Sequence, residues 1–408
     1  MNRRQFLVGS AALLGYLARA RAAPRGGPAR ACIVLWMNGG PSHLDTFDPK
    51  PGTKSGGPFR DIPTRVPELR LCEHLPQLAE QAHHLAVVRS LTSREGNHQR
   101  AQFLLHTGYA PNPTVDHPAL GSWVSAELGD PAFDLPACVS IGGPGGDAGF
   151  LGLEHGPFVV ERPGQPPDNT DHPPGVDFVR FLRRKVALEE MERRYQGRVQ
   201  DPQLRSRQAV RDRAVRMMYA PRLRAFDLSE EPDALRTAYG NNDFGRGCLL
   251  ARRLVEAGVR YVEVVLDGWD THQDAFGRLR TLLGVLDPAM ATLIRDLEQR
   301  ALLPRTLVLW LGEFGRTPTI NANEGRDHHP QAFSAVLCGG GVRGGMVYGA
   351  TDDEGARVVE HPVRVPDLFA TVAVLLGLDP AREVRTPSGR PVSITDGGQP
   401  VRALLAAS

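Results

Sequence analysis

Three polar clusters in the C-terminal half contain the residue types that could do chemistry. The first two come after apolar runs and the third after a short polar loop, and together they contain Asp270, His272, Glu313, Arg316, Asp327, His328 and His329. Carboxylates and imidazoles are the side chains that hold zinc and other divalent metals in hydrolytic sites. Open α/β sheets assemble such sites where parallel strands end. The sequence therefore predicts a metal-assisted hydrolase, whose predicted metal ligands in these clusters are Asp270, His272, Glu313, Asp327, His328 and His329.

Structural roles remain open for some of the same side chains. Asp270 could cap the helix that follows it, with His272 merely hydrogen-bonded to the aspartate. Glu313 lies three residues before Arg316, so these two could form a structural ion pair at the end of a strand. The metal interpretation gains from the pair His328 and His329, which is preceded by an aspartate and follows a short polar loop.

The N-terminal half adds a glycine-containing loop directly after its first apolar run. In this loop Ser42, His43 and Asp45 supply a candidate nucleophile, a candidate catalytic base and a carboxylate. Ser90 and Thr92 follow a second apolar run and are candidate nucleophiles, although such residues are more often helix caps. The chain has neither the Gly-Lys-Ser/Thr ending of a phosphate-binding loop nor the Gly-x-Ser-x-Gly of a serine elbow.

These residues are positioned by alternating strands and helices. Continuous apolar runs predict strands at 31–37, 85–88, 137–141, 261–266, 306–311 and 333–337. Helical patterns occupy 73–83, 98–107, 274–301 and 366–376, whereas 156–175 is rich in Pro and Gly and indicates a long surface loop. This alternation predicts an α/β fold with a mostly parallel central sheet and helices on both faces, within a domain at 31–400. Residues 176–257 are predicted to be a helical insertion.

Composition limits the partners of the chain. With 408 residues, 41% hydrophobic and 23% charged, and a net charge of +2, nothing favours nucleic acid as a partner. The arginine-dense part of 176–257 is interleaved with Glu189, Glu190 and Glu192, which is typical of a solvated helix face. The five cysteines show no paired spacing, so neither a disulfide framework nor a cysteine zinc site is indicated.

The first residues indicate export. Arg3 and Arg4 precede an apolar stretch and an Ala-x-Ala pattern, so residues 1–23 are predicted to be a twin-arginine signal read by the twin-arginine export machinery. The alternative is a chance arginine pair before a buried or membrane-anchoring helix, but the apolar core is shorter than the roughly 20 residues needed to span a bilayer. We therefore expect a periplasmic or secreted protein without a stable membrane span after cleavage.

Longer motifs carry a resemblance to a known family. The segments 39–51, 268–272 and 313–318, together with Asp327 and His328, resemble the exported bacterial domain-of-unknown-function family 1501. That family is similar in architecture to the alkaline phosphatase and sulfatase superfamily. The resemblance implies an alkaline phosphatase-like sheet with a metal site at its C-terminal edge and ester hydrolysis through a Ser, Thr or modified Cys nucleophile.

The resemblance also implies roles for individual residues. Asp270 and His272 resemble a carboxylate and histidine ligand pair, Glu313 resembles a strand-end carboxylate ligand, and His328 or His329 resembles the final histidine ligand.

Two positions depart from the superfamily pattern. Asn38 stands where the first-strand aspartate is expected, and Phe314 stands where a histidine normally follows the strand-end carboxylate. Asp45 or His43 would then replace the ligand missing at Asn38.

The remaining roles in catalysis go to hydroxyl and guanidinium groups. Ser90 or Thr92 would be the nucleophile, and Arg89 or Arg316 would steady the anionic group.

The sequence therefore predicts an exported metal-dependent hydrolase of phosphate or sulfate esters. The metal is expected to be zinc, with calcium, magnesium or manganese as alternatives, and the substrate an anionic small-molecule or polysaccharide ester. The competing hypothesis is a non-catalytic periplasmic binding or scaffold protein that keeps the fold and a partial metal site. The departures at Asn38 and Phe314 favour that alternative, whereas the Asp, His and Glu set favours the enzyme.

Overall fold

The computed structural model describes residues 27–168, 170–196, 199 and 201–407. The predicted twin-arginine signal at 1–23 therefore lies outside the described residues. Within the described ranges, every helix is too short or too polar to cross a membrane. The described cysteines, which are all five of the chain, are buried and free.

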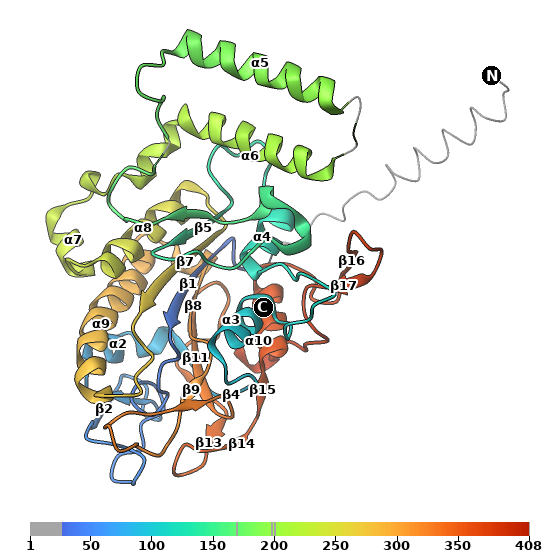
Figure 1. The fold of residues 1–408 in the computed structure, drawn as a ribbon. Coiled ribbons are helices and arrows are strands. Elements are labelled where there is room, and N and C mark those ends of the chain that lie inside the picture. The colour runs from blue at the N-terminus through green and yellow to red at the C-terminus, as the bar shows by residue number, and fades with distance from the viewer. Residues whose placement is uncertain (1–26, 169, 197–198, 200, 408) are drawn as a thin grey trace.

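A mixed but mostly parallel sheet runs through the centre of the molecule (Figure 1). Of its described strands, only β11 is antiparallel to its neighbours, which are β4 and β8. From one edge to the other the strands are β12 (Met346–Tyr348), β4 (Leu85–Thr92), β11 (Phe333–Cys338), β8 (Thr306–Leu311), β1 (Ala31–Asn38), β7 (Tyr261–Asp267), β5 (Cys138–Ile141) and β6 (Phe158–Val160), with β15 (Val363–Arg364) also paired to β4. The predicted fold class is confirmed.

Strand β1 shows how the sequence places two hydrophobic cores. Alternate side chains of a strand point to opposite faces of the sheet. Ile33 and Leu35 accordingly belong to one buried core, and Val34 and Trp36 belong to the other. Both faces of β1 are buried, which explains its continuous apolar run.

Helices cover both faces of the sheet (Figure 1). The core that contains Ile33 is closed by α2 (Pro76–Glu80), α7 (Asp233–Tyr239), α8 (Asp243–Ala257) and α9 (Ala275–Gln299). The core that contains Val34 is closed by α3 (His98–Thr107), α4 (Leu120–Leu128) and α10 (Val365–Leu375).

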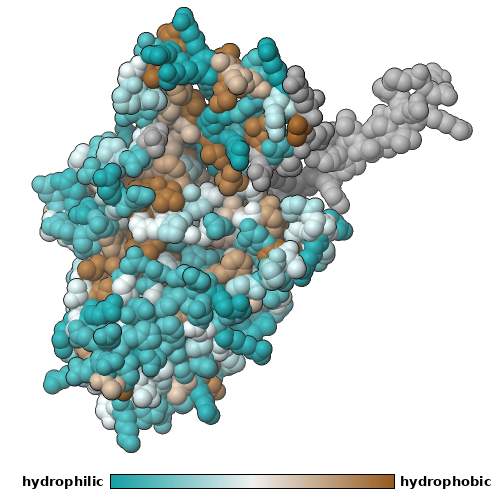
Figure 2. Space-filling view, in the orientation of Figure 1, coloured by the Kyte–Doolittle hydropathy of each residue, from teal (hydrophilic) through white to brown (hydrophobic). Residues whose placement is uncertain are grey.

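The segment predicted as a helical insertion contains helices of two kinds. Helix α8 is an integral layer of the fold, because Leu249, Leu250 and Leu254 are buried against the sheet. Helices α5 (Phe178–Gln196) and α6 (Pro202–Met218) instead lie beyond the β5 end of the sheet, and no side chain of α5 is buried. Figure 2 shows apolar and hydrophilic residues interspersed on this part of the surface.

Two local predictions were wrong, and both errors arise from tertiary pairing. Strand β4 continues through Ser90 to Thr92, because β11 and β15 hydrogen-bond to its polar second half. The predicted loop at 156–175 contains β6, which gains its partner only from β5. The shorter strand pairs are β2 (Asp61–Pro63) with β3 (Arg70–Cys72), β9 (Gly315–Arg316) with β10 (His328–His329), β13 (Ala350–Thr351) with β14 (Val358–Glu360), and β16 (Glu383–Arg385) with β17 (Pro391–Ser393).

Candidate metal centre

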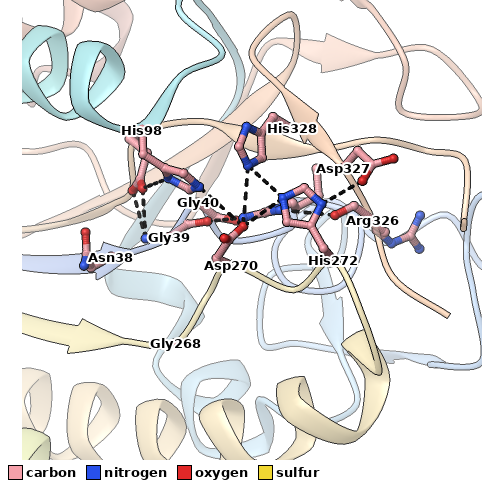
Figure 3. A network of polar contacts seen from close by, with 12 residues as sticks. Asn38, Gly39, Gly40, His98, Gly268, Asp270, His272, Arg326, Asp327 and His328 are labelled. Carbon is pink, nitrogen blue, oxygen red and sulfur yellow. Dashed lines mark hydrogen bonds and ion pairs between the residues drawn. The ribbon is translucent and has the colours of Figure 1, made fainter. Parts of the chain in front are cut away.

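A cluster of imidazoles and carboxylates lies at the carboxyl ends of the central strands (Figure 3). Asp270 and His272 follow β7, Glu313 follows β8, and His328 belongs to β10. The first residue of α3, His98, approaches the cluster from the helix side. The arrangement agrees with the rule that open α/β sheets place their sites at this edge.

One oxygen atom lies at the centre of the cluster. Oδ1 of Asp270 is 3.1 Å from Nε2 of His272, 3.4 Å from Nε2 of His98 and 3.5 Å from Nε2 of His328. His98, Asp270 and His328 each offer a ligand atom, and all three atoms lie within 4.8 Å of one another. Four side chains from separate parts of the chain thus turn toward one small volume.

The other ring nitrogen of each imidazole faces an acceptor. Nδ1 of His98 is 2.7 Å from Oε1 of Glu313, and Nδ1 of His272 is 2.7 Å from Oδ1 of Asp327. Nδ1 of His328 is 2.8 Å from the carbonyl oxygen of Gly96. Such acceptors hold the proton on Nδ1, so that Nε2 presents its lone pair to the centre, as in histidines that ligate metals.

The Nε2 atoms of His272 and His328 are only 3.0 Å apart. Two lone pairs at this distance repel, so a proton or a metal cation must lie between or beside them. Nε2 of His98 is buried and has no hydrogen-bond partner among the described residues. These two observations fit a cation at the centre, where His98, Asp270 and His328 offer ligand atoms and His272 lies beside Asp270 and His328.

Glu313 supports this centre from behind. Its side chain has no exposed surface, and its two oxygens accept the backbone N–H of Gly39 at 2.9 and 3.2 Å. The carboxylate therefore ties the end of β8 to the turn after β1 and orients His98. Position 39 requires glycine, because a Cβ there would lie 2.4 Å from the backbone nitrogen of Asp270.

Arg316 is buried beneath Asp270 and uses all three of its nitrogens on protein oxygens. Its Nε donates to the carbonyl of Gly40 at 2.9 Å, and one terminal nitrogen donates to the carbonyl of Arg326 at 3.1 Å. The other terminal nitrogen donates to Oδ1 of Asp270 at 2.6 Å and to the carbonyl of Gly39. Arg316, predicted to steady an anionic substrate, thus holds the central carboxylate.

Electrostatics keep the central carboxylate ionised. Burial raises the pKa of Asp270, but the hydrogen bond and charge of Arg316, with His98 and His272, outweigh it and hold the pKa at about 2. The hydrogen bond to Glu313 raises the pKa of His98. Burial, helped by Arg316 and the neighbouring imidazoles, lowers the pKa of His328, so His328 offers a free lone pair more readily than His98 does.

Phe314 forms one wall of the centre. Its buried ring lies 4.9 Å from the ring of His98 and 4.5 Å from that of His328, measured between centroids. Gly40, with a φ of +79°, allows this packing, because a Cβ there would lie 2.7 Å from the phenyl ring. Phe314 therefore packs against two candidate ligands.

In the loop after β1, Asp45 forms a buried ion pair with Arg326. Asp45 and Arg326 have no exposed surface, and Nε of Arg326 donates to Oδ2 of Asp45 at 2.8 Å. Ser42 donates its hydroxyl to the same carboxylate at 2.5 Å. Nε2 of His43 lies 2.8 Å from the carbonyl of Gly355, and burial lowers the pKa of His43 to about 4. The structure does not bring Asp45 or His43 to the central oxygen.

The remaining predicted residues also lie outside the central four. Ser90 is buried within β4 and donates its hydroxyl to the carbonyl of His361 at 2.7 Å, whereas Thr92 is partly exposed at the carboxyl end of β4. Nε2 of His329 is 2.8 Å from the carbonyl of Ala356, because neighbouring residues of a strand point in opposite directions. Asp327 lies behind His272, as Glu313 lies behind His98.

His98 is the member of the centre that the sequence did not identify as a ligand. The available signal was its place after Asn97, which caps α3 by accepting the N–H of Arg100. The spacing of residues along the chain could not show that this helix end lies opposite the ends of β7 and β8.

Comparisons with known proteins complete the description. A family model described as "Protein of unknown function (DUF1501)" matches residues 29–405. No curated protein matches the chain. Solved structures with some likeness include a lipoteichoic acid synthase from Listeria monocytogenes, at 8% identity and a TM-score of 0.41, covering 92% of this chain and 77% of that one. A second is a sulfatase from Pseudoalteromonas sp., at 13% identity and a TM-score of 0.38, covering 93% of this chain and 72% of that one. A third is alkaline phosphatase from the Antarctic bacterium TAB5, at 10% identity and a TM-score of 0.32, covering 77% of this chain and 92% of that one.

Proposed function

We propose a function for this chain, which belongs to the family described as protein of unknown function (DUF1501): it is an exported, metal-dependent hydrolase of phosphate or sulfate esters. One observation carries the proposal. The Nε2 atoms of His98, His272 and His328 converge on Oδ1 of Asp270, while each Nδ1 faces an acceptor. Export rests on the Arg3 and Arg4 pattern of the sequence.

The four central residues would hold one divalent cation, with zinc favoured because imidazoles dominate the set. When bound, such a metal polarises an ester oxygen and lowers the pKa of a water molecule. The protein supplies the orientation: Glu313, Asp327 and the Gly96 carbonyl fix the three rings, and Arg316 keeps Asp270 ionised.

The first turn of α3 is suited to the anionic part of the substrate. His98 begins this helix, so the N–H groups of its first turn and the positive end of its dipole lie beside the cluster. Arg316 is less suited to the task because its donors are engaged. Of the predicted nucleophiles, Ser90 is bonded to the carbonyl of His361, which leaves Thr92 and water as candidates.

The alternative, a non-catalytic binding or scaffold protein, is favoured by one observation. Nδ2 of Asn38 donates to Oδ1 of Asp267 at 2.5 Å, and its own oxygen accepts from Gln102 at 2.7 Å. The amide at the end of β1 is therefore engaged away from Asp270, on the side that Figure 3 shows apart from the network.

Elemental analysis first tests whether the protein binds metal, which both proposed functions require. We expect about one equivalent of zinc in the wild-type protein from metal-replete cells, and its loss in a His272→Ala/His328→Ala double variant. His361→Asn, which changes an exposed histidine with a φ of +46°, is the control that should keep the metal. Less than about a tenth of an equivalent in the wild type would contradict the metal centre. For metal-loaded protein, aryl phosphates, phosphodiesters and sulfates then test hydrolysis, and no turnover of any of them favours the binding protein.

A further inference from the structure

A cavity of about 400 Å³ lies beside the metal centre, between α3 and the carboxyl ends of β1, β5 and β7. Its volume is that of a small-molecule site. Part of its wall is the glycine-rich loop after β5, where a Cβ on Gly143 would lie 2.8 Å from Val265. The loop can approach the sheet this closely because its glycines lack side chains, and the cavity remains open above it.

The carboxylates and basic side chains that line the cavity are unequal in number. Asp147, Glu263 and Asp267 line it, and the residues that line it within the described part of the chain include neither lysine nor arginine. Burial lowers the pKa of His106, but Glu263, 3.3 Å away, outweighs burial and leaves that pKa raised. Asp147 and Asp267 have no ion-pair partner among the described residues, which leaves the cavity negative.

A second, independent feature points to a ligand. His117 lines the cavity, is 6% exposed, and its Nδ1 has no hydrogen-bond partner among the described residues. Its ring stacks on Tyr109 with centroids 3.8 Å apart. Burial lowers the pKa of His117, so the ring is neutral and can accept a hydrogen bond. An unpaired buried imidazole is unfavourable unless a ligand or water satisfies it.

The cavity and the metal centre share structural elements. Helix α3 carries His98 at its first position and Gln102 one turn later, where its amide bonds to Asn38 at the cavity wall. Asp267 lines the cavity and precedes the central Asp270 by three residues. A molecule with its ester group at the metal centre could therefore extend into the cavity.

We propose that this cavity binds the organic part of the substrate, and that this part is a hydroxylated group carrying an ammonium, as in an amino sugar. The carboxylates of Asp147 and Asp267 would neutralise the ammonium, and the amides of Gln99 and Gln102, with His117, would bond to hydroxyls. The same carboxylates would repel an anionic sugar. The assignment rests on the proposed function, since it names the substrate class of the same site.

The test is calorimetric titration of D-glucosamine, D-glucose and D-glucuronate into the full chain, with zinc and after chelation. We expect glucosamine to bind most tightly and glucuronate least. Asp147→Asn and Asp267→Asn should each weaken glucosamine binding roughly two- to fivefold, as for one partly exposed ion pair, and leave glucose unchanged. Asp353→Asn, an exposed aspartate outside the cavity, is the matched control and should change nothing.

The outcomes separate this proposal from the proposed function. Glucosamine binding that is absent, that is no tighter than glucuronate binding, or that neither substitution weakens overturns the cavity assignment, even if the protein holds zinc. Glucosamine binding that follows the expected pattern in a protein that never holds zinc supports the cavity and contradicts the metalloenzyme.

Discussion

The Nδ1 atom of His98 lies 2.7 Å from Oε1 of Glu313, a carboxylate with no exposed surface. This contact joins the start of α3 to the end of β8 and turns the free nitrogen of His98 toward Asp270. A buried carboxylate behind an imidazole is the arrangement that orients metal-ligating histidines.

Glu313→Gln tests this supporting role, because glutamine keeps the shape and removes the charge. We expect zinc affinity to fall about 10- to 100-fold, as for the loss of a partner behind a ligating histidine. Competition against a chromophoric chelator measures the affinity. Glu360→Gln, on the exposed strand β14, is the control and should bind zinc as the wild type does. Unchanged affinity in Glu313→Gln would show that the carboxylate does not support the site.

The pair Asp45 and Arg326 is expected to stabilise the fold. Arg326→Met leaves a buried carboxylate without its cation, so the free energy of unfolding should fall by about 3–5 kcal/mol. Asp45→Asn/Arg326→Met removes both charges and should recover part of that loss in urea unfolding. A double variant no more stable than Arg326→Met would contradict the pairing, and loss of zinc from Asp45→Asn would return Asp45 to the ligand set.

Gly40→Ala tests the packing of Phe314 against the cluster. Gly40 and Gly52 have nearly equal φ angles, +79° and +80°, but only the Cβ at position 40 would meet another group. Gly52→Ala should therefore lower the free energy of unfolding by the backbone strain alone, about 1–2 kcal/mol. Gly40→Ala should lose more stability and also bind zinc more weakly, because Phe314 contacts His98 and His328. Equal effects of the two substitutions in urea unfolding and zinc titration would refute this role.

His43 should make stability fall in acid. Burial is the main cause that lowers its pKa from 6.5 to about 4. The unfolded chain therefore takes up a proton that the folded chain refuses, and stability present above pH 6.5 is lost progressively as the pH falls to about 4. The loss amounts to about 3 kcal/mol.

The comparison with His43→Gln isolates this contribution, since glutamine can still donate to the carbonyl of Gly355. Urea unfolding of both proteins at several pH values between about 7.5 and about 4.5 should show their difference in stability narrowing, or reversing, as the pH falls. A difference that is independent of pH would mean that His43 titrates normally in the folded protein.

The sequence was a good guide to the sheet and a partial guide to the site. Apolar runs such as 31–37 and 306–311 identify buried parallel strands, because both faces of those strands are covered. The same logic places Asp270, His272 and Glu313 at strand ends. It fails where strand pairing overrides composition, so the polar half of β4 was mistaken for the loop after a strand. Ser90, predicted as a candidate nucleophile, is buried within that strand.

The division of the cluster into proposed ligands and the groups that contact them from behind could not be read from sequence. His98 reaches the centre only because α3 packs opposite the ends of β7 and β8. Asp45 is separated from Arg326 by most of the chain, so the spacing along the sequence gives no sign of their pairing. Asp327 and Glu313 have the right chemistry for ligands. Each instead contacts the Nδ1 atom of an imidazole, Asp327 that of His272 and Glu313 that of His98.

The most direct test is a crystal structure of the zinc-loaded protein with anomalous data at the zinc edge. We expect a peak about 2.0–2.2 Å from Nε2 of His98, His272 and His328 and from Oδ1 of Asp270. The other described group that could hold an ion, His83 with His84 and Glu298, serves as the internal comparison. No peak at Asp270, or a peak at Glu298 alone, would contradict a metal centre at Asp270.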